Sequence, residues 1–227
     1  MTIYPTQDYA VITGDIVRSS TLNAVERASL LIEIKRASQA LQEKFPDDVI
    51  QPVDVFRGDG WQFVISRPER AFRVGLFFRA WIRAHVPPGR RLDTRMAVAV
   101  GRVTSIPTNR VSGGDGEAFR ASGRALEHLR EPLRLALVVP PTAAPGLAAA
   151  LGAFAPVFDS LVQGWTQCQS RAVVARLHGA TQDAIAHTWP ETITRQAIAR
   201  HLAKAHWPAV ESGLHWWEGS PWRLQMS

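Results

Sequence analysis

The sequence predicts an α+β fold, in which a βαββαβ sheet domain precedes an all-helical C-terminal region. Short apolar segments at residues 9–17, 53–65 and 94–103 are typical of strands. Between them, residues 22–45 and 69–85 carry apolar side chains at three- and four-residue steps, which indicates amphipathic helices. An Ala/Pro/Gly-rich passage at residues 140–146 is the best candidate for a domain boundary.

The composition is that of a globular protein. The 227 residues are 46% apolar and 20% charged, which suffices for one large domain or two small ones. The sequence has no run of about eighteen uncharged apolar residues and no leader-like start, so we expect a cytoplasmic chain that does not enter a membrane. Cys168 is the single cysteine, so no intrachain disulfide forms, and no zinc-site spacing is present.

The basic excess is a weak signal for a partner. A net charge of +6 favours a polyanion on electrostatic grounds. The excess is spread along the chain, and arginine bias from a GC-rich genome explains it equally well. Net charge alone therefore does not decide whether the chain binds nucleic acid.

The first strand and helix follow from residues 9–45. The stretch "YAVITGDIV", Tyr9–Val17, is an apolar strand interrupted near its end by Gly14 and Asp15. Residues 22–45 follow as a helix, with its apolar positions on one face. Asp15 is thus expected at the C-terminal end of the first strand.

The stretch "VFRGDGWQFVI", Val55–Ile65, predicts a β-hairpin. Two apolar runs flank the segment Arg57–Gly60, which has turn composition. Asp59 lies in that turn, where an aspartate between two glycines can also serve only to make a local side-chain-to-backbone bond. The helix at residues 69–85 and the strand "TRMAVAVGRV" at residues 94–103 complete the βαββαβ order.

This order brings Asp15 and Asp59 together. A right-handed crossover leaves one slot between the first two strands, and the hairpin return fills it, so the first and third strands become antiparallel neighbours. Two carboxylates at this place would repel each other unless a cation lies between them. Oxygen ligands of this kind suit Mg²⁺ or Mn²⁺ holding phosphate groups. The alternative is a turn-and-cap role without metal.

The C-terminal region differs from the rest of the chain in composition and in its predicted elements. We expect a sheet domain at residues 1–140, a linker at residues 141–160 and a helical domain at residues 161–227. One helix lies within residues 161–179, and two shorter ones begin after the N-cap residues Thr181 and Thr194. Two short helices of this kind favour a helix-turn-helix whose second helix reads the major groove of double-stranded DNA. An ordinary amphipathic helix with a solvated outer face fits the pattern equally well.

The candidate DNA-contacting residues lie at the caps and on the outer face of the second short helix, where Arg and Gln suit base edges and Lys and Thr suit phosphates. They are Thr181, Gln182, Thr194, Arg195, Gln196, Arg200, His201 and Lys204.

The sheet domain resembles the catalytic palm of class III nucleotide cyclases and, more distantly, of GGDEF diguanylate cyclases. "ITGDIVRSS" resembles their first-strand motif and "FRGDGWQFVI" their hairpin, which implies that Asp15 and Asp59 are the catalytic metal ligands. "GEAFRASGRALE" resembles their ribose- and phosphate-binding helix, with Arg124 at the arginine position and Arg120 where those cyclases have asparagine. The resemblance implies that Arg124 is a third catalytic residue, which counters charge on the transferred phosphate. The nucleotide-binding residues that the resemblance implies are Gly14, Ile16, Gly58, Gly60, Arg120 and Arg124. Val55 stands where many cyclases have the purine-selecting lysine.

The whole chain resembles the SatD-like group, in which such a palm is joined to a C-terminal DNA-binding segment. "TQDAIAHTWPETITRQAIARHL" is similar to helix-turn-helix segments of sigma-factor region four. The resemblance implies a homodimeric, DNA-binding transcriptional regulator whose palm binds a nucleotide and metal or serves as a dimerisation scaffold. The alternative is an active nucleotidyl cyclase. "SGGDGEAF", Ser112–Phe119, fits a flexible glycine loop or a phosphate-cradling loop equally well.

Overall fold

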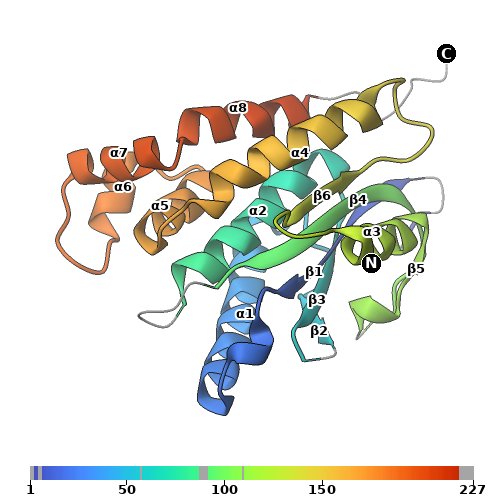
Figure 1. The fold of residues 1–227 in the computed structure, drawn as a ribbon, viewed down its shortest axis with the longest axis horizontal. Coiled ribbons are helices and arrows are strands. Elements are labelled where there is room, and N and C mark those ends of the chain that lie inside the picture. Colours follow the sequence, from blue (N-terminus) through green and yellow to red (C-terminus); the bar gives the residue numbers. More distant parts are fainter. Residues whose placement is uncertain (1–2, 5–6, 57, 87–91, 109, 220–227) are drawn as a thin grey trace.

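A computed structural model describes residues 3–4, 7–56, 58–86, 92–108 and 110–219 of the chain. Its centre is a sheet in the order β2-β3-β1-β4-β5, with β6 also paired to β4 (Figure 1). The strands are β1 (Asp8–Ile16), β2 (Asp54–Phe56), β3 (Gly60–Ile65), β4 (Thr94–Ser105), β5 (Asp115–Gly116) and β6 (Leu135–Val138).

The strand order confirms the predicted βαββαβ arrangement. β3 lies between β2 and β1 and is antiparallel to both. β4 is antiparallel to β1 on its other side, and β6 adds a parallel strand to β4. Arg57, in the predicted hairpin turn, lies outside the described residues.

Three helices cover the two faces of the sheet. On one face, α1 (Ala24–Lys44) and α2 (Pro68–Ala84) pack over Ile12, Phe63 and Val98. On the other, α3 (Glu117–His128) packs over Tyr9, Val11 and Val64 through Ala118 and Phe119. All six residues of β3 are buried, because both of its faces are covered, and Gln62 is the one polar side chain among them.

The predicted helix boundaries agree with local capping chemistry. α1 starts after Asn23, whose side chain accepts the N–H of Glu26 while the Glu26 carboxylate accepts the N–H of Asn23. This capping box satisfies donors that the first helical turn leaves unpaired. α2 starts with Pro68, whose fixed φ suits the first turn of a helix.

The predicted linker at residues 141–160 differs from the structure, because most of it is helix α4 (Leu147–Gln163). This segment is rich in Ala and Leu, which are strong helix formers. Its Leu151, Ala155 and Phe158 are buried, at the spacing of one helix face. Pro145 and Gly146 precede the helix, so their composition marks a helix start and not an extended linker.

The remaining helices are α5 (Gln167–Leu177), α6 (Gln182–His187), α7 (Arg195–Lys204) and α8 (Trp207–Glu218). Of these, α5 and α8 pack onto α2, α7 packs against α5 and α8, and α6 packs against α7. Thr181 and Thr194 cap α6 and α7 as predicted, accepting the N–H groups of Ala184 and Ala197. The core is continuous with that of the sheet domain, since the Phe72 ring of α2 lies 4.7 Å from that of Phe158 and 5.6 Å from that of Trp217.

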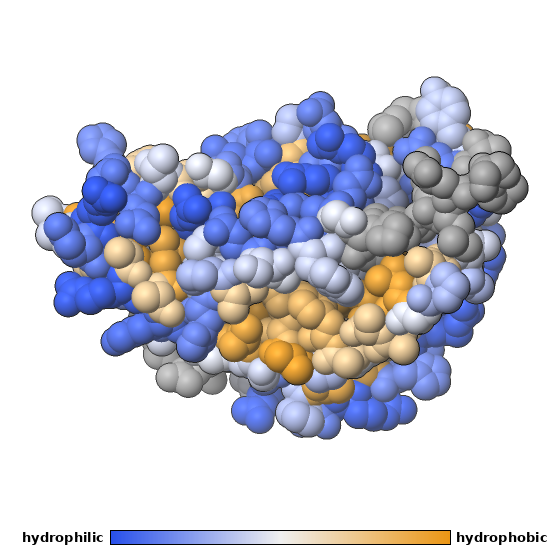
Figure 2. Space-filling model, turned by 90° about the horizontal axis from the view of Figure 1, so that it is seen from above, coloured by the Kyte–Doolittle hydropathy of each residue, from blue (hydrophilic) through white to orange (hydrophobic). Residues whose placement is uncertain are grey.

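Seen from the side of α8, the surface is mostly hydrophilic, with an apolar patch toward the lower edge of the view (Figure 2). Within the described part of the chain, none of the helices has the length and apolar content needed to cross a membrane.

Candidate functional site

The structure brings Asp15 and Asp59 to the same pocket. Asp15 stands in β1 directly opposite Gly60, the first residue of β3, and Asp59 immediately precedes Gly60. Both aspartates line a pocket of about 720 Å³. The strand register therefore places the two positions side by side as the element order predicted, whereas their role as metal ligands stays a prediction.

Both carboxylates already have polar partners. Arg95, in β4 opposite Asp15, donates from its Nε to Asp15 Oδ1 at 2.9 Å and from its second terminal nitrogen to Oδ2. The Ser19 hydroxyl donates to Asp59 Oδ2. Hydrogen bonding to Asp15 raises the pKa of Arg95, with the nearby charge of Asp59 a smaller contribution. The guanidinium therefore neutralises part of the charge that two carboxylates bring to this place.

Gly14 is required by packing beside the pocket. A Cβ at this position would lie 2.2 Å from Trp61 Cζ2 and 2.4 Å from the Arg95 carbonyl oxygen, and neither the ring nor the backbone can move away cheaply. Gly14 lines the pocket, and its missing side chain lets the fully buried Trp61 lie against β1. The sequence motif around Asp15 thus has a structural reason besides any ligand.

A buried polar group forms another part of the pocket wall. The Gln62 amide donates to Thr13 Oγ1 at 2.6 Å, and the Thr13 and Ser122 hydroxyl oxygens are 2.8 Å apart. Thr13 and Gln62 line the pocket, and Ser122 is fully buried beneath them in α3. These side chains satisfy one another, which is what buried polar groups require.

The rest of the pocket combines apolar and polar walls. Val55, Phe56 and Leu126 supply apolar surface, whereas Arg110 and Ser112 supply polar groups. The pocket thus has carboxylates with a guanidinium beside them in one part of its wall and apolar side chains in another. Such a pocket suits a ligand that has a charged part and a planar or apolar part. A nucleotide has both parts.

The arginines predicted from the helix motif lie elsewhere. α3 contributes Gly123, Leu126 and Glu127 to the pocket lining, whereas Arg120 and Arg124 are exposed on the same helix. Arg120 forms an ion pair with Asp115. Within this chain, neither arginine is among the residues that line the pocket.

The structure also places the three other predicted nucleotide-binding residues. Ile16 is buried in the core shared with α1 and α2, so its side chain is committed to packing. Gly58 is exposed in the hairpin turn at φ 89°, a conformation that favours glycine. Gly60 lines the pocket.

The donor set fits a divalent cation in part. Asp15 and Asp59 offer hard carboxylate oxygens of the kind that Mg²⁺ and Mn²⁺ take, with substrate phosphates completing the coordination. No cluster of three or more His, Cys, Asp or Glu side chains suited to a metal occurs among the described residues. A cation held here by Asp15 would also compete with the Arg95 guanidinium for the same oxygens.

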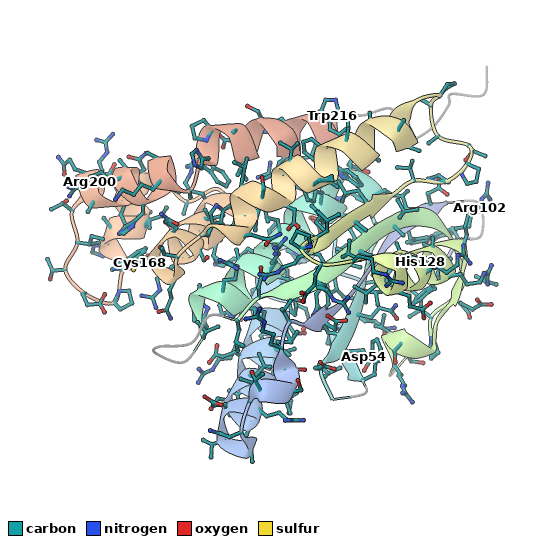
Figure 3. The ribbon with its side chains drawn as sticks, in the orientation of Figure 1. Asp54, Arg102, His128, Cys168, Arg200 and Trp216 are labelled. Atoms are coloured by element: carbon teal, nitrogen blue, oxygen red, sulfur yellow. The ribbon has the colours of Figure 1, made fainter. Side chains whose placement is uncertain are left out.

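The predicted DNA-contacting face lies at one end of the molecule. Ile198 and Leu202 are buried, whereas Arg195, Gln196 and Arg200 are exposed on α7, and Figure 3 shows Arg200 directed away from the other helices. Of the remaining candidates, Thr181, Thr194 and Lys204 are exposed, and Gln182 and His201 are half-buried.

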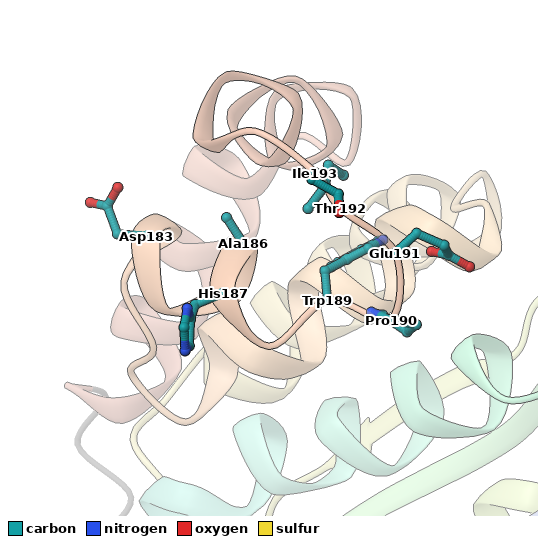
Figure 4. Close-up of a pocket in the computed structure, with 8 residues that line it drawn as sticks. All are labelled: Asp183, Ala186, His187, Trp189, Pro190, Glu191, Thr192 and Ile193. Carbon is teal, nitrogen blue, oxygen red and sulfur yellow. The ribbon is translucent and has the colours of Figure 1, made fainter.

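The α6–α7 connection is held by an aromatic stack. The Trp189 and His201 rings lie 5.8 Å apart and nearly parallel, and the Arg171 guanidinium lies 5.4 Å from the Trp189 ring centre. Beside it, a pocket of about 500 Å³ includes Asp183 and Glu191 (Figure 4). Their carboxylates make this pocket unfavourable for a phosphate group.

Sequence reasoning missed Arg95, Ser19 and the Thr13–Gln62 pair. Arg95 had a usable signal, because it is the charged residue directly before the apolar run Met96–Val100 of β4, and the antiparallel register sets it opposite Asp15. Ser19 and Asp59 are 40 positions apart in the sequence, and no local sequence pattern predicts their contact.

Comparisons with known proteins find similarity only among solved structures. No family model matches the chain, and no curated protein matches it. The chain is similar to the guanylyl cyclase domain of the RhoGC fusion protein from Blastocladiella emersonii, with 16% identity, 54% of this chain and 75% of that chain covered, and a TM-score of 0.43.

Two further structures give comparable values. The GTP-bound guanylate cyclase domain of RhGC from Catenaria anguillulae is 15% identical, with 54% and 73% coverage and a TM-score of 0.42. The GGEEF domain of a diguanylate cyclase from Vibrio cholerae is 15% identical, with 58% and 83% coverage and a TM-score of 0.42. With TM-scores this low, the fold described above rests on the strand order and register alone.

Proposed function

We propose that this chain binds a nucleoside triphosphate with Mg²⁺ or Mn²⁺ in the Asp15/Asp59 pocket, and that its reaction is cyclisation of that nucleotide. The observation that carries the proposal is the convergence of the two aspartates on one large pocket. Its walls offer charged groups at one place and apolar side chains at another, as a nucleotide requires.

The residues of the chain have distinct tasks in this reaction. Asp15 and Asp59 would hold the cation, which would favour bonding of the 3′-oxygen to the α-phosphorus, with pyrophosphate as the leaving group and the 3′-hydroxyl proton passing to solvent. Arg95 leaves Asp15 in part and donates to the triphosphate, so that its positive charge stays in the site. Val55, Phe56 and Leu126 enclose the base, with no charged side chain among these three to select it.

A product assay tests the proposal. Purified chain is incubated with Mn²⁺ and each nucleoside triphosphate in turn, and cyclic nucleotide is measured. We expect product from wild type, and its loss in Asp59→Ala, because one of the two carboxylate ligands is gone. Asp183→Ala, which removes an exposed carboxylate on α6 outside this pocket, is the matched control and should retain activity. Absence of product from every substrate removes the enzymatic proposal.

DNA binding through α7 is a second candidate. The observation that favours it is the separation of α7 into a buried side and a side carrying exposed Arg195, Gln196 and Arg200. In this function the chain acts as a homodimeric transcriptional regulator, and the palm is its nucleotide sensor or its dimerisation scaffold. Two-fold symmetric proteins match two-fold symmetric operators.

Binding to the promoter region of the chain's own gene at moderate salt tests this candidate. We expect Arg195→Ala combined with Arg200→Ala to weaken binding about 10-fold or more, since each arginine makes phosphate or base contacts. Arg120→Ala combined with Arg124→Ala removes the same charge from α3 and serves as the control. Unchanged affinity in the α7 variant rules the candidate out.

A further inference from the structure

We propose that Asp159 of α4 is a positioning residue for Asp15, acting through a continuous set of buried and half-buried hydrogen bonds. The inference rests on the proposed function for its ligand-binding readout. Under this inference, the C-terminal helices help to hold the pocket residues in position.

The first link joins α4 to α2. Arg79 in α2 is fully buried, and its Nη1 donates to Asp159 Oδ1 at 2.6 Å. Asp159, also fully buried, accepts the backbone N–H of Arg134 with Oδ2 at 2.7 Å. Burial of this kind is tolerated only where a charge is fully paired, so the positions of these groups are tightly constrained.

The second link joins α2 to the start of β4. The Arg79 Nε and Nη2 atoms each donate to one oxygen of Asp93 at 2.9 Å. Asp93 also receives Arg83 Nη1 at 2.8 Å and Arg134 Nη1 at 2.7 Å. Burial acts to raise the pKa of the Asp93 carboxyl, but the arginine charges outweigh it and hold that pKa well below its ordinary value.

The third link reaches Asp15. Asp93 Oδ1 accepts the N–H of Thr94 at 2.9 Å, and the Thr94 hydroxyl donates to the carbonyl oxygen of Asp15 at 2.5 Å. Arg95, the next residue, holds the Asp15 carboxylate. Displacement of Asp93 therefore moves both the backbone contact and the side-chain contact of Asp15.

Trp61 reports on this last link. Its indole Nε1 donates to Thr94 Oγ1 at 2.8 Å, and the ring is fully buried. Hydrogen exchange of that indole N–H, assigned among the eight tryptophans with Trp61→Phe, measures the order of the Thr94 contact without any ligand.

A second ionic contact between the C-terminal helices and α2 supplies a matched control. Glu218 of α8 accepts from Arg70 Nη1 at 3.0 Å and from Arg73 at 2.6 and 3.0 Å. These bonds tie α8 to the N-terminal half of α2 and do not continue to Asp93 or Thr94. Glu218→Gln therefore loosens the same helices without touching the proposed connection.

The experiment compares Asp159→Asn with Glu218→Gln. We expect Asp159→Asn to speed exchange of the Trp61 indole and to weaken Mn²⁺–triphosphate binding about 10-fold, as is typical when groups behind a metal ligand are removed. Glu218→Gln should leave both unchanged. Arg134→Ala, which removes a half-buried partner of Asp93, should act like Asp159→Asn even if the latter variant folds poorly.

Two outcomes overturn the inference. One is unchanged Trp61 exchange in both Asp159→Asn and Arg134→Ala. The other is an equal change in those variants and in Glu218→Gln, which would mean general loosening and not positioning. If wild-type chain binds no triphosphate, the proposed function fails, and Trp61 exchange alone decides whether Asp159 positions Asp15.

Discussion

Replacement of Arg79 by methionine is the sharpest test of what holds the C-terminal helices to the sheet. Arg79 is fully buried and makes three hydrogen bonds to Asp93 and Asp159. Burial acts to lower its pKa, yet the charges of the two aspartates raise it above the ordinary value. The pairing interactions therefore outweigh the cost of desolvating the guanidinium.

The size of the effect follows from what each aspartate retains. Asp93 keeps Arg83 and Arg134, whereas Asp159 loses its ion pair with Arg79 and keeps two neutral donors, the Arg134 backbone N–H and the Gln163 amide. Breaking a buried pair on one side costs about 3–5 kcal/mol. Because only one carboxylate is stranded, we expect Arg79→Met to lower the free energy of unfolding by about 3 kcal/mol.

Equilibrium unfolding in urea, followed by tryptophan fluorescence, measures this change. Arg36→Met is the control, since Arg36 pairs with Glu33 on an exposed helix turn, where a pair contributes about 0.3 kcal/mol. The double variant with Asp159→Asn should lose less than the sum of the single losses, because the stranded charge is gone. A loss for Arg79→Met no larger than that for Arg36→Met would refute the reasoning.

Three further predictions concern packing, pH and the α6–α7 connection. Gly14→Ala should lower the free energy of unfolding by about 2 kcal/mol through its clash with Trp61, whereas Gly123→Ala, with open space around it, should not; equal effects would contradict the packing argument. Burial lowers the pKa of His85 and His178, so the unfolded chain binds protons more readily, and stability should fall from about pH 7.5 to about pH 5.5; His85→Gln should flatten that slope. If α7 binds DNA as proposed, Trp189→Ala should weaken that binding, because the Trp189 ring links Arg171 of α5 to His201 of α7; unchanged affinity would show that the stack is dispensable.

The order of the elements and the meeting of Asp15 with Asp59 could be predicted from sequence because both follow from strand periodicity and crossover handedness. The helix caps at Thr181 and Thr194 were also readable, since a cap depends on residues within one turn. The helix at residues 147–163 was not predicted. The prolines and the glycine near residue 145 indicated a linker, and the alanine- and leucine-rich run that follows them was read as part of it.

The contacts around the pocket required the folded structure. Asp159 and Arg79 are 80 positions apart, and nothing local to either residue indicates that they meet. The exposed positions of Arg120 and Arg124 on α3 depend likewise on how the helix turns over the sheet. Sequence patterns fix which face of a helix is buried more readily than they fix which polar groups pair.

The measurement that tests the central claim most directly is paramagnetic broadening of backbone NMR signals by Mn²⁺ in the presence of a non-hydrolysable triphosphate. The account predicts broadening at Gly14, Gly60 and Trp61, none at Gln196 on α7, and loss of the effect in Asp15→Asn combined with Asp59→Asn. Broadening that survives in the double variant, or that appears only away from this pocket, would contradict it.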